Sequence, residues 1–233
     1  MRGILAESCD SVAPRAVYGV LLNFRDELAA LGNAVDQKPY NQPPRGPVLY
    51  VKPANTWIGD AGRIPLPAGE SVVEPGATLG IVFGRTATRV SEREATEYVA
   101  GYCVINDVRL PHTSFYRPAL RQLCRDGFCA IGARVVAHDQ AGDVAALTLR
   151  TYINGALQHE SNTAGLVRSV PRLIADITEF MTLSPGDILM LGVAAGRPAA
   201  RAGDRIRIEV PGIGAIENPV VAADGAAGNR RAS

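Results

Sequence analysis

The chain has 233 residues, of which 24 are Lys or Arg and 23 are Asp or Glu, so its formal net charge is +1. A near-neutral chain lacks the strongly basic surface of nucleic-acid-binding proteins, which argues against that class. The longest uncharged apolar run lies near residues 188–196 and is far shorter than the ~20 residues that span a bilayer. The length predicts one large domain or two small ones around a real core.

The cysteines and the N-terminus give a first expectation of compartment. The four cysteines share no C-x-x-C spacing and have no paired histidines near them; they are Cys9, Cys103, Cys124 and Cys129. A zinc site is therefore not expected, and reduced thiols favour a cytoplasmic protein. The short apolar stretch at the N-terminus is followed by Glu7, which argues against a secretory signal.

Glycine (24 residues) and proline (16) divide the chain into short segments, which favours a β-rich fold. The predicted strands, in chain order, are Val17–Leu22, Val48–Val51, Leu79–Phe83, Gly101–Val108, Leu147–Ile153, Ala156–His159, Ile188–Val193, Arg205–Val210 and a last strand that ends near Val221. Asn154-Gly155 is a strong type I′ hairpin signal between two of them.

Two helices are predicted among these strands. The capping box formed by Ser91 and Glu94 predicts a helix that runs to about Ala100. Apolar residues on one helical face predict a second helix over Arg172–Met181, with Ser169 near its start. Because helices and strands do not alternate as βαβ units, we expect a mixed α+β, β-rich fold with closed or layered sheets.

The domain prediction follows the same pattern. Residues 16–221 are expected to form a single domain, with a lid-like loop at about 24–46 that contains the Pro-rich connection 38–44. Residues 1–15 are weakly patterned, and the tail 222–233 has no core-forming residues and is expected to be disordered.

One strand ends in residues that can carry chemistry. The apolar strand Gly101–Val108 places Asn106 and Asp107 at its edge. These side chains suit a turn, through their backbone hydrogen bonds, and they equally suit a ligand site for a hard cation such as Mg²⁺. The three histidines, His112, His138 and His159, stand in no recognisable nucleophile motif.

The same strand carries a resemblance. Gly101–Val108 reads Gly-Tyr-x-x-x-Asn-Asp-Val and resembles the core motif of the fumarylacetoacetate hydrolase family. Phe180–Asp187 is similar to the family's Phe-x-Thr-Leu-x-Pro-Gly-Asp segment, and Val48–Pro53 to its Phe-x-Lys-Pro segment. Order and spacing agree over roughly residues 16–221. The resemblance implies mixed sheets that form a flattened β-roll or barrel with few short helices.

Three further segments resemble one branch of the family: Lys52–Thr56, Ser114–Ala119 and Cys124–Cys129. That branch decarboxylates 5-oxopent-3-ene-1,2,5-tricarboxylate and isomerises 2-hydroxyhepta-2,4-diene-1,7-dioate in 4-hydroxyphenylacetate (homoprotocatechuate) degradation. Its two homologous halves form one chain in some organisms and two chains in others. This sequence looks like the amino-terminal half, or first subunit. The resemblance thus implies a small polycarboxylate substrate and a homodimer, or a heteromer with a homologous sister subunit.

The resemblance also implies a metal, expected to be Mg²⁺, bound by a Glu-x-Glu pair and the Asp of Asn-Asp-Val. A metal-chelated 2-oxo acid is an electron sink for C–C cleavage or proton transfer. Asp107 matches, but Gly76 and Thr78 stand where the two glutamates are expected. Leu123 stands where the family has a substrate-binding Lys. On the lid, Glu27 and Ala30 stand where some members have His and Glu.

Two readings remain open. In the first, the chain is a catalytic subunit in which Asp107, with Glu74, Thr78 and a water, holds Mg²⁺. Arg117, Arg125 and Asn106 are then the expected substrate-binding residues, since guanidinium groups clamp carboxylates. In the second, the degenerate site makes the chain a non-catalytic partner that stabilises or shapes an active sister subunit. No catalytic residue is assigned in either reading.

Overall fold

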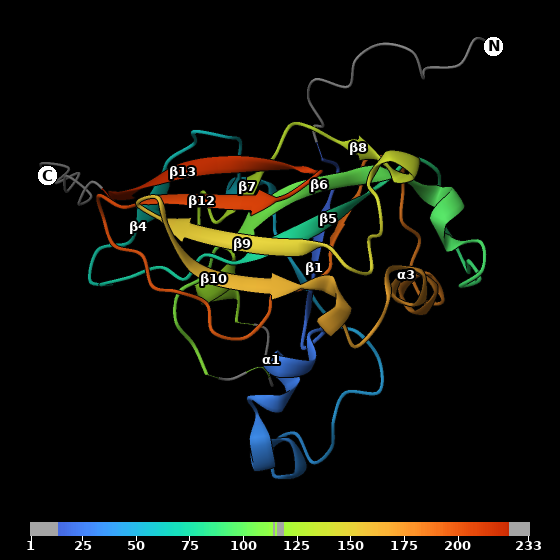
Figure 1. Ribbon diagram of the computed structural model, residues 1–233. Helices are drawn as coiled ribbons and strands as arrows, with labels where there is room; N and C mark the ends of the chain where they lie inside the picture. The colour runs from blue at the N-terminus through green and yellow to red at the C-terminus, as the bar shows by residue number, and fades with distance from the viewer. Residues whose placement is uncertain (1–13, 114, 116–118, 224–233) are drawn as a thin grey trace, which may run out of the picture.

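The computed structural model of the chain describes residues 14–113, 115 and 119–223. Two curled sheets pack against each other, with a single longer helix at one side (Figure 1). The first sheet contains β1 (Val17–Leu21), β2 (Val48–Val51), β3 (Trp57–Ile58), β5 (Ala77–Phe83), β6 (Val99–Asp107), β7 (Cys129–Ile131), β8 (Val136–Ala137) and β11 (Ile188–Met190). The second contains β4 (Ile64–Leu66), β9 (Thr148–Ile153), β10 (Ala156–Asn162), β12 (Arg205–Val210) and β13 (Gly214–Ala222).

Both sheets are mixed. In the first, the order is β2-β1-β11-β5-β6-β7-β3, with β8 paired to β6; β1 runs parallel to β11, and β3 to β7. In the second, the order is β10-β9-β12-β13-β4, and only the β13–β4 pair is parallel among the described strands. The predicted fold, a β-rich roll of mixed sheets with few short helices, is confirmed.

The helical segments are short. They are α1 (Arg25–Ala29), α2 (Leu120–Leu123) and α3 (Val170–Thr178), with single 3-10 turns at Gly32–Asp36, Ala54–Thr56, Ala95–Tyr98, His138–Gln140 and Thr163–Gly165. The N-terminal cap predicted at Ser169 is confirmed, because its side chain accepts a hydrogen bond from Arg172 N. Within the described residues, no helix has the length and apolar character needed to cross a membrane.

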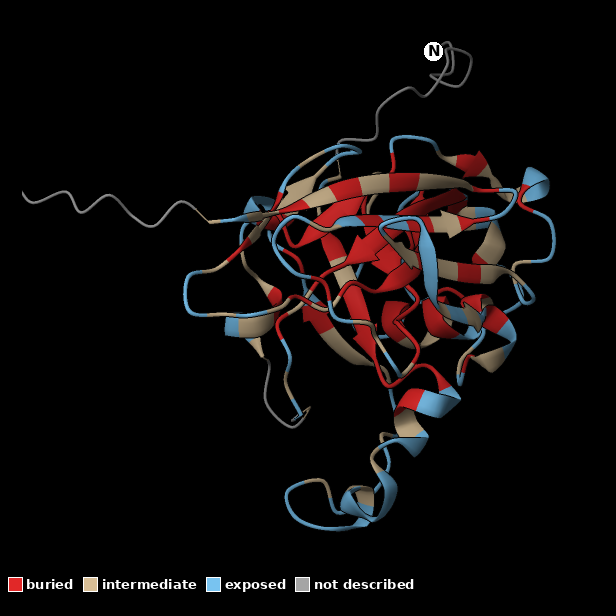
Figure 2. Cartoon of the chain, turned by 60° about the vertical axis from the view of Figure 1, so that its left-hand side comes forward, coloured by how far each residue is buried: buried red, intermediate tan, exposed pale blue. Residues whose placement is uncertain are grey.

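The core explains why the centre of the first sheet is rigid. All seven residues of β5 are buried, so this strand is covered on both faces. One face, with Leu79 and Ile81, joins the main core, which also contains Ile206 of the second sheet and Leu173 of α3. On the other face, Val82 belongs to a second buried cluster, which also contains Val17 of β1 and Ile188 of β11. Figure 2 shows these buried strands in the middle of the molecule. Strands β5 and β6 therefore form a fixed frame for any side chain at their ends.

Local sequence patterns predict the structure correctly where neighbouring residues alone determine it, as in a hairpin turn. Asn154 (φ +53) and Gly155 (φ +81) form the predicted hairpin turn between β9 and β10. The helix predicted from Ser91 to about Ala100 is wrong. Ser91 Oγ hydrogen-bonds Glu94 Oε2 at 2.6 Å, so the two side chains satisfy each other instead of capping a helix. Only the 3-10 turn at Ala95–Tyr98 forms there, because Val99 already pairs with β5 as the start of β6.

The segment 24–46, which we call the lid segment, projects from the body of the molecule (Figures 1 and 2). It carries α1 and one 3-10 turn before the chain returns as β2. Its base is fixed by the fully buried Asn23. The Asn23 amide donates to Leu191 O at 2.9 Å and accepts from Arg168 N at 3.0 Å. The start of α1 is thus held in place, whatever the outer part of the segment does.

Candidate functional site

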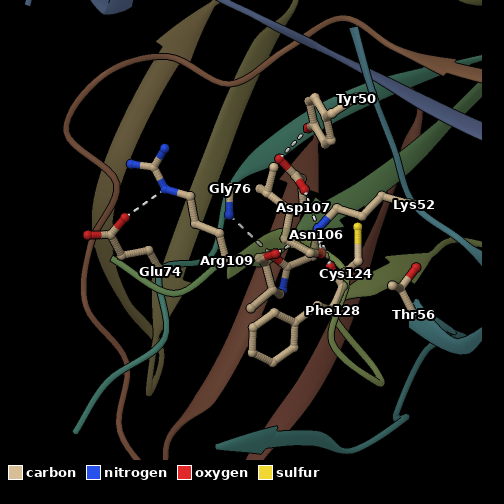
Figure 3. A network of polar contacts seen from close by, with 12 residues as sticks. Tyr50, Lys52, Thr56, Glu74, Gly76, Asn106, Asp107, Arg109, Cys124 and Phe128 are labelled. Atoms are coloured by element: carbon tan, nitrogen blue, oxygen red, sulfur yellow. Dashed lines mark hydrogen bonds and ion pairs between the residues drawn. The ribbon is translucent and has the colours of Figure 1, made fainter. Parts of the chain in front are cut away.

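A buried carboxylate lies where β6 ends. Asp107 is the last residue of this strand, and its side chain has no exposed surface. Its Oδ2 accepts hydrogen bonds from the Tyr50 hydroxyl at 2.7 Å and from Arg197 Nη2 at 2.9 Å, and its Oδ1 lies 2.8 Å from Lys52 Nζ. Figure 3 shows Tyr50 and Lys52 turned toward this carboxylate. One anion is therefore held by a phenol and a cation at the end of β2 and by a second cation from the loop after β11.

These contacts determine whether Asp107 and Tyr50 are ionised. Burial alone would raise the pKa of Asp107, but the charges of Lys52 and Arg197 outweigh burial and hold that pKa well below its usual range. Burial, together with the charge of Asp107, raises the pKa of Tyr50 well above its ordinary value. Near neutral pH the centre thus consists of an ionised Asp107, a neutral phenol donor and two cations.

Lys52 ties this centre to the backbone. Its Nζ donates to the carbonyl oxygens of Val108 at 2.7 Å, Leu123 at 2.8 Å and Phe128 at 3.0 Å. An ammonium has three N–H donors, and all three are used by these carbonyls. The short approach to Asp107 Oδ1 is therefore a Coulombic contact rather than a fourth hydrogen bond. Lys52 joins the end of β6 to α2 and to the chain before β7, which is a structural role.

Arg197 approaches Asp107 from the loop after β11. Its Nη1 donates to the Asp107 backbone carbonyl at 2.6 Å and its Nη2 to the carboxylate at 2.9 Å. One guanidinium thus makes two hydrogen bonds to the same residue. Burial alone would lower the pKa of Arg197, but Asp107 and Tyr50 more than offset it, and the pKa is raised. The arginine therefore stays a cation although its side chain is only 3% exposed.

Gly76 makes the room for this guanidinium. A Cβ at position 76 would lie 2.6 Å from Arg197 Nη1 and 2.9 Å from its Cζ, closer than side-chain atoms approach each other. Thr78, the next residue but one, is turned elsewhere: its hydroxyl donates to Gly192 O at 2.6 Å. Arg197 can therefore occupy this position only because residue 76 has no side chain.

Arg197 also forms one wall of a cavity of about 260 Å³. Its other polar walls include Glu27, Arg109 and His112, and its apolar walls include Leu31 and Phe115. Arg109 pairs with Glu74, its Nε lying 2.8 Å from Oε2, while its buried Nη1 has no hydrogen-bond partner among the described residues. Burial and the charge of Arg197 lower the pKa of Arg109. Two guanidinium groups therefore face one small cavity, an arrangement that favours an anionic ligand.

Glu27 faces the same cavity from α1. Its Oε2 accepts a 2.6 Å hydrogen bond from Leu22 N, where the backbone has φ +59, an uncommon conformation for leucine. The residue is only 6% exposed. Burial raises the pKa of Glu27 to about 7, although Arg197 and the Leu22 N–H act in the opposite direction. Near neutral pH this carboxyl exists in both its protonated and its ionised form, as an acid–base group requires.

Comparison with known proteins identifies the fold around this site. The family model described as fumarylacetoacetate (FAA) hydrolase C-terminal matches residues 16–221. The chain belongs to the FAA hydrolase family. The family expected from the Asn106-Asp107 motif is thereby confirmed.

Individual relatives in the FAA hydrolase family are isomerases, decarboxylases and hydrolases. The 4-hydroxyphenylacetate degradation bifunctional isomerase/decarboxylase of Escherichia coli is 45% identical over 205 residues, which are 88% of this chain and 47% of that protein. The chain thus spans about half the length of the curated relatives it matches first. The crystal structure of 5-carboxymethyl-2-hydroxymuconate delta-isomerase from Mycobacterium smegmatis has a TM-score of 0.77 at 29% identity, covering 93% of this chain and 82% of that one.

A third relative has been solved with a metal. Maleylpyruvate hydrolase from Sphingobium sp. SYK-6, in complex with manganese(II) and pyruvate, has a TM-score of 0.71 at 26% identity, covering 91% of this chain and 72% of that one. The expectation that the family binds a divalent metal is supported at this level, without a preference for Mg²⁺.

The residues of the present chain do not fit such a metal. Both oxygens of Asp107 already contact Lys52, Tyr50 or Arg197, and Arg197 occupies the space beside Gly76. Across residues 14–113, 115 and 119–223, no group of three or more His, Cys, Asp or Glu side chains is arranged to hold a metal ion. A dication at this point would also meet two cations at close range.

The structure brings together only some of the residues singled out from the sequence. Asn106 is buried, and its Oδ1 accepts from Gly76 N at 3.2 Å. Glu74 pairs with Arg109 and does not contact Asp107, and Figure 3 shows Arg109 turned toward Glu74. Arg125 donates to Arg121 O at 2.9 Å and lines a different hollow, beside Asp126. Arg117 lies outside the described residues.

Three residues of the cavity had no assigned role in the sequence interpretation: Arg109, Arg197 and Glu27. Glu27 was noticed as a departure on the lid, but its burial was not foreseeable from the pattern. Arg197 stands 90 residues from its partner Asp107. The available signal was indirect: where two acidic ligands are missing beside a retained Asp, a cation elsewhere in the chain has to balance it.

Proposed function

We propose that this chain is a subunit of an enzyme that decarboxylates 5-oxopent-3-ene-1,2,5-tricarboxylate and isomerises 2-hydroxyhepta-2,4-diene-1,7-dioate. The observation that carries the proposal is the 45% identity, over 88% of the chain, to the E. coli bifunctional isomerase/decarboxylase. That match corresponds to about half of the bifunctional protein, so the chain acts with a homologous sister subunit, or as a homodimer, in the cytoplasm.

The charge of the cavity supports the substrate class. Arg109 and Arg197 face a cavity of about 260 Å³, of a size for a small organic acid. Arginine binds carboxylates through two parallel N–H···O bonds, and Arg109 Nη1 has no hydrogen-bond partner among the described residues. A substrate with a carboxylate at each end can therefore use both guanidinium groups.

According to the proposal, this subunit lacks a functional metal site. Gly76 and Thr78 replace the expected acidic pair, and Arg197 supplies the positive charge beside Asp107. A reaction that needs a chelated dication, such as decarboxylation of the tricarboxylate, then takes place in the sister subunit.

A second candidate function is that of a non-catalytic partner, which keeps the scaffold and stabilises or shapes the sister subunit. One observation favours it: Asp107, the residue matching the family's metal ligand, is fully used in an internal network with Lys52, Tyr50 and Arg197. Such a network holds a fold together even when no reaction takes place in it.

Metal titration and activity assays test the proposal together. Calorimetry with Mn²⁺ and with Mg²⁺ is expected to give no saturable binding to the chain alone. The matched control is the variant Gly76→Glu/Thr78→Glu/Arg197→Val, which restores an acidic pair and is expected to gain Mn²⁺ binding. Both reactions are then assayed with the chain alone, with a sister subunit that has the Glu-x-Glu pair, and with the mixture.

The proposal predicts decarboxylation only where the sister subunit is present. Tight Mn²⁺ binding by the chain alone, followed by decarboxylation, would contradict the degenerate site. If neither substrate is turned over by the mixture, the assignment to this enzyme fails. If turnover by the mixture is unchanged by every substitution in the cavity of this chain, the non-catalytic partner is the correct function.

A further inference from the structure

We propose that the cavity between α1 and Arg197 is a metal-independent proton-transfer site for unsaturated dicarboxylates, in which Glu27 moves the proton and Arg197 takes the place of a metal ion. The proposal rests on the proposed function for its substrate and deepens it, because it assigns the isomerisation to this chain and names the residues. It is carried by the positions of Glu27, Arg109 and Arg197 around one cavity.

Glu27 is placed for proton transfer by its backbone support. One oxygen, Oε2, is fixed by Leu22 N at 2.6 Å, and no other hydrogen bond to this carboxyl is seen within the described residues, so Oε1 remains for a ligand. The support itself is rigid, since Leu22 directly precedes Asn23, whose buried amide joins this corner to Leu191 O and to Arg168 N. The carboxyl therefore meets the cavity in one orientation.

Arg197 supplies what a metal otherwise supplies, a fixed positive charge. A guanidinium has five N–H donors, and the contacts to Asp107 use two of them, which leaves donors for an oxygen in the cavity. Because both Asp107 and Lys52 are buried beside it, the guanidinium cannot move away from its position without breaking the ion pairs. A preorganised cation of this kind stabilises an oxyanion as it forms.

The charges around Glu27 suit the group to both halves of a proton transfer. The cations Arg109 and Arg197 and the side chain of His112 line the same cavity, and the charge of Asp107 also acts on Glu27. The cations favour the ionised form, while burial favours the protonated form, and the resulting pKa of about 7 keeps both populated near neutral pH.

The reaction balances as a proton shift. In the direction of ketonisation, the enol oxygen of a 2-hydroxy-2,4-dienoate loses its proton to water, and the negative charge that develops on this oxygen is stabilised by Arg197. The double bonds at C2–C3 and C4–C5 are replaced by C2=O and C3=C4, and the protonated Glu27 gives its proton to C5. Water returns a proton to Glu27. No electrons are exchanged with an external oxidant or reductant, and no C–C bond breaks.

The experiment follows isomerisation of 2-hydroxyhepta-2,4-diene-1,7-dioate by the chain alone in excess EDTA, together with deuterium incorporation at C5 in D₂O. Wild type is compared with Glu27→Gln, Glu27→Asp and Arg197→Met, and with Glu97→Gln as the matched control, since Glu97 is exposed and does not line the cavity. Binding of heptane-1,7-dioate, a saturated probe that cannot react, is measured by calorimetry for each protein.

We expect wild type and Glu97→Gln to turn over without metal, with kcat falling as the pH rises through about 7. Glu27→Gln is expected to lower kcat by about 100-fold or more, with KM changed by no more than about 3-fold, and to lose the pH dependence. Glu27→Asp should restore part of kcat, and Arg197→Met should weaken binding of the saturated probe.

Wild type that binds the probe but is inactive until Mn²⁺ is added would overturn the proposal while leaving the proposed function in place. The same holds if Glu27→Gln keeps the wild-type rate and folds normally by circular dichroism. A chain that neither binds the probe nor contributes to turnover with the sister subunit overturns both.

Discussion

The buried carboxyl of Glu27 makes a stability prediction that needs no substrate. Its pKa is raised from the ordinary 4.5 to about 7, mainly by burial. A group whose folded pKa is raised favours folding in its protonated form. Its contribution is fully present below about pH 4.5 and is lost as the pH rises through about 7. Above that pH the folded protein contains an ionised Glu27 carboxylate that is largely excluded from solvent.

Replacing Glu27 by Gln removes this titration while keeping an acceptor oxygen for Leu22 N. Each pKa unit corresponds to about 1.4 kcal/mol, so a change from 4.5 to about 7 corresponds to about 3 kcal/mol of free energy of unfolding. We therefore expect Glu27→Gln to gain up to about 3 kcal/mol relative to wild type between about pH 5 and about pH 8.

Urea denaturation of both proteins at the two pH values measures this gain, with Glu97→Gln as the control variant. The other titratable groups are shared by wild type and Glu27→Gln, so their contributions cancel in the difference. If the gap between wild type and Glu27→Gln is the same at both pH values to within about 0.5 kcal/mol, the carboxyl is not buried as described and the reasoning fails.

The Asp107 centre and its glycine give the remaining predictions. Asp107→Asn should destabilise the chain by about 3–5 kcal/mol in urea denaturation, because it leaves the buried Lys52 and Arg197 without an anion. Arg197→Met should destabilise it less, because the Lys52–Asp107 ion pair that remains has no net charge. An equal cost for both variants would contradict this charge balance. Gly76→Ala should cost about 1–3 kcal/mol, because its Cβ would meet Arg197 at 2.6 Å, whereas Gly46→Ala, with nothing within 4 Å, should be near neutral. The cost of Gly76→Ala should shrink in an Arg197→Ala background, and an unchanged cost there would contradict the contact.

Local sequence signals predicted the fold where the physical cause is local. The Asn154-Gly155 turn and the Ser169 cap depend on a few neighbouring residues, and both form as expected. The fully buried β5 is readable because a strand covered on both faces is a continuous apolar run. The capping box at Ser91 failed because strand pairing of Val99 with β5 competes with helix formation over the same residues.

The site was predictable only in part. Asp107 was singled out as a metal ligand from its motif, whereas the structure places it in an ion-pair network with Lys52 and Arg197. The absence of the acidic pair at Gly76 and Thr78 followed from the same resemblance. What replaces that pair was not predictable, because the Arg197–Asp107 contact joins residues 90 positions apart through the way β11 pairs beside β5. The raised pKa of Glu27 likewise results from burial, and the sequence of a short polar helix such as α1 does not predict that one of its carboxyl groups is buried.

The charges around Asp107 also bear on which of the two reactions suits this chain. Asp107, Lys52 and Arg197 together have a net charge of +1, and Arg109 is paired with Glu74. While Glu27 is protonated, the cavity therefore offers about one uncompensated positive charge. A chelated dication offers two charges and holds both oxygens of a 2-oxo acid, as cleavage of a C–C bond requires. One fixed guanidinium is enough to stabilise an enolate oxygen while a nearby carboxyl moves a proton. The proposed replacement of a metal by Arg197 thus predicts isomerisation by this chain and decarboxylation by a subunit that has the acidic pair.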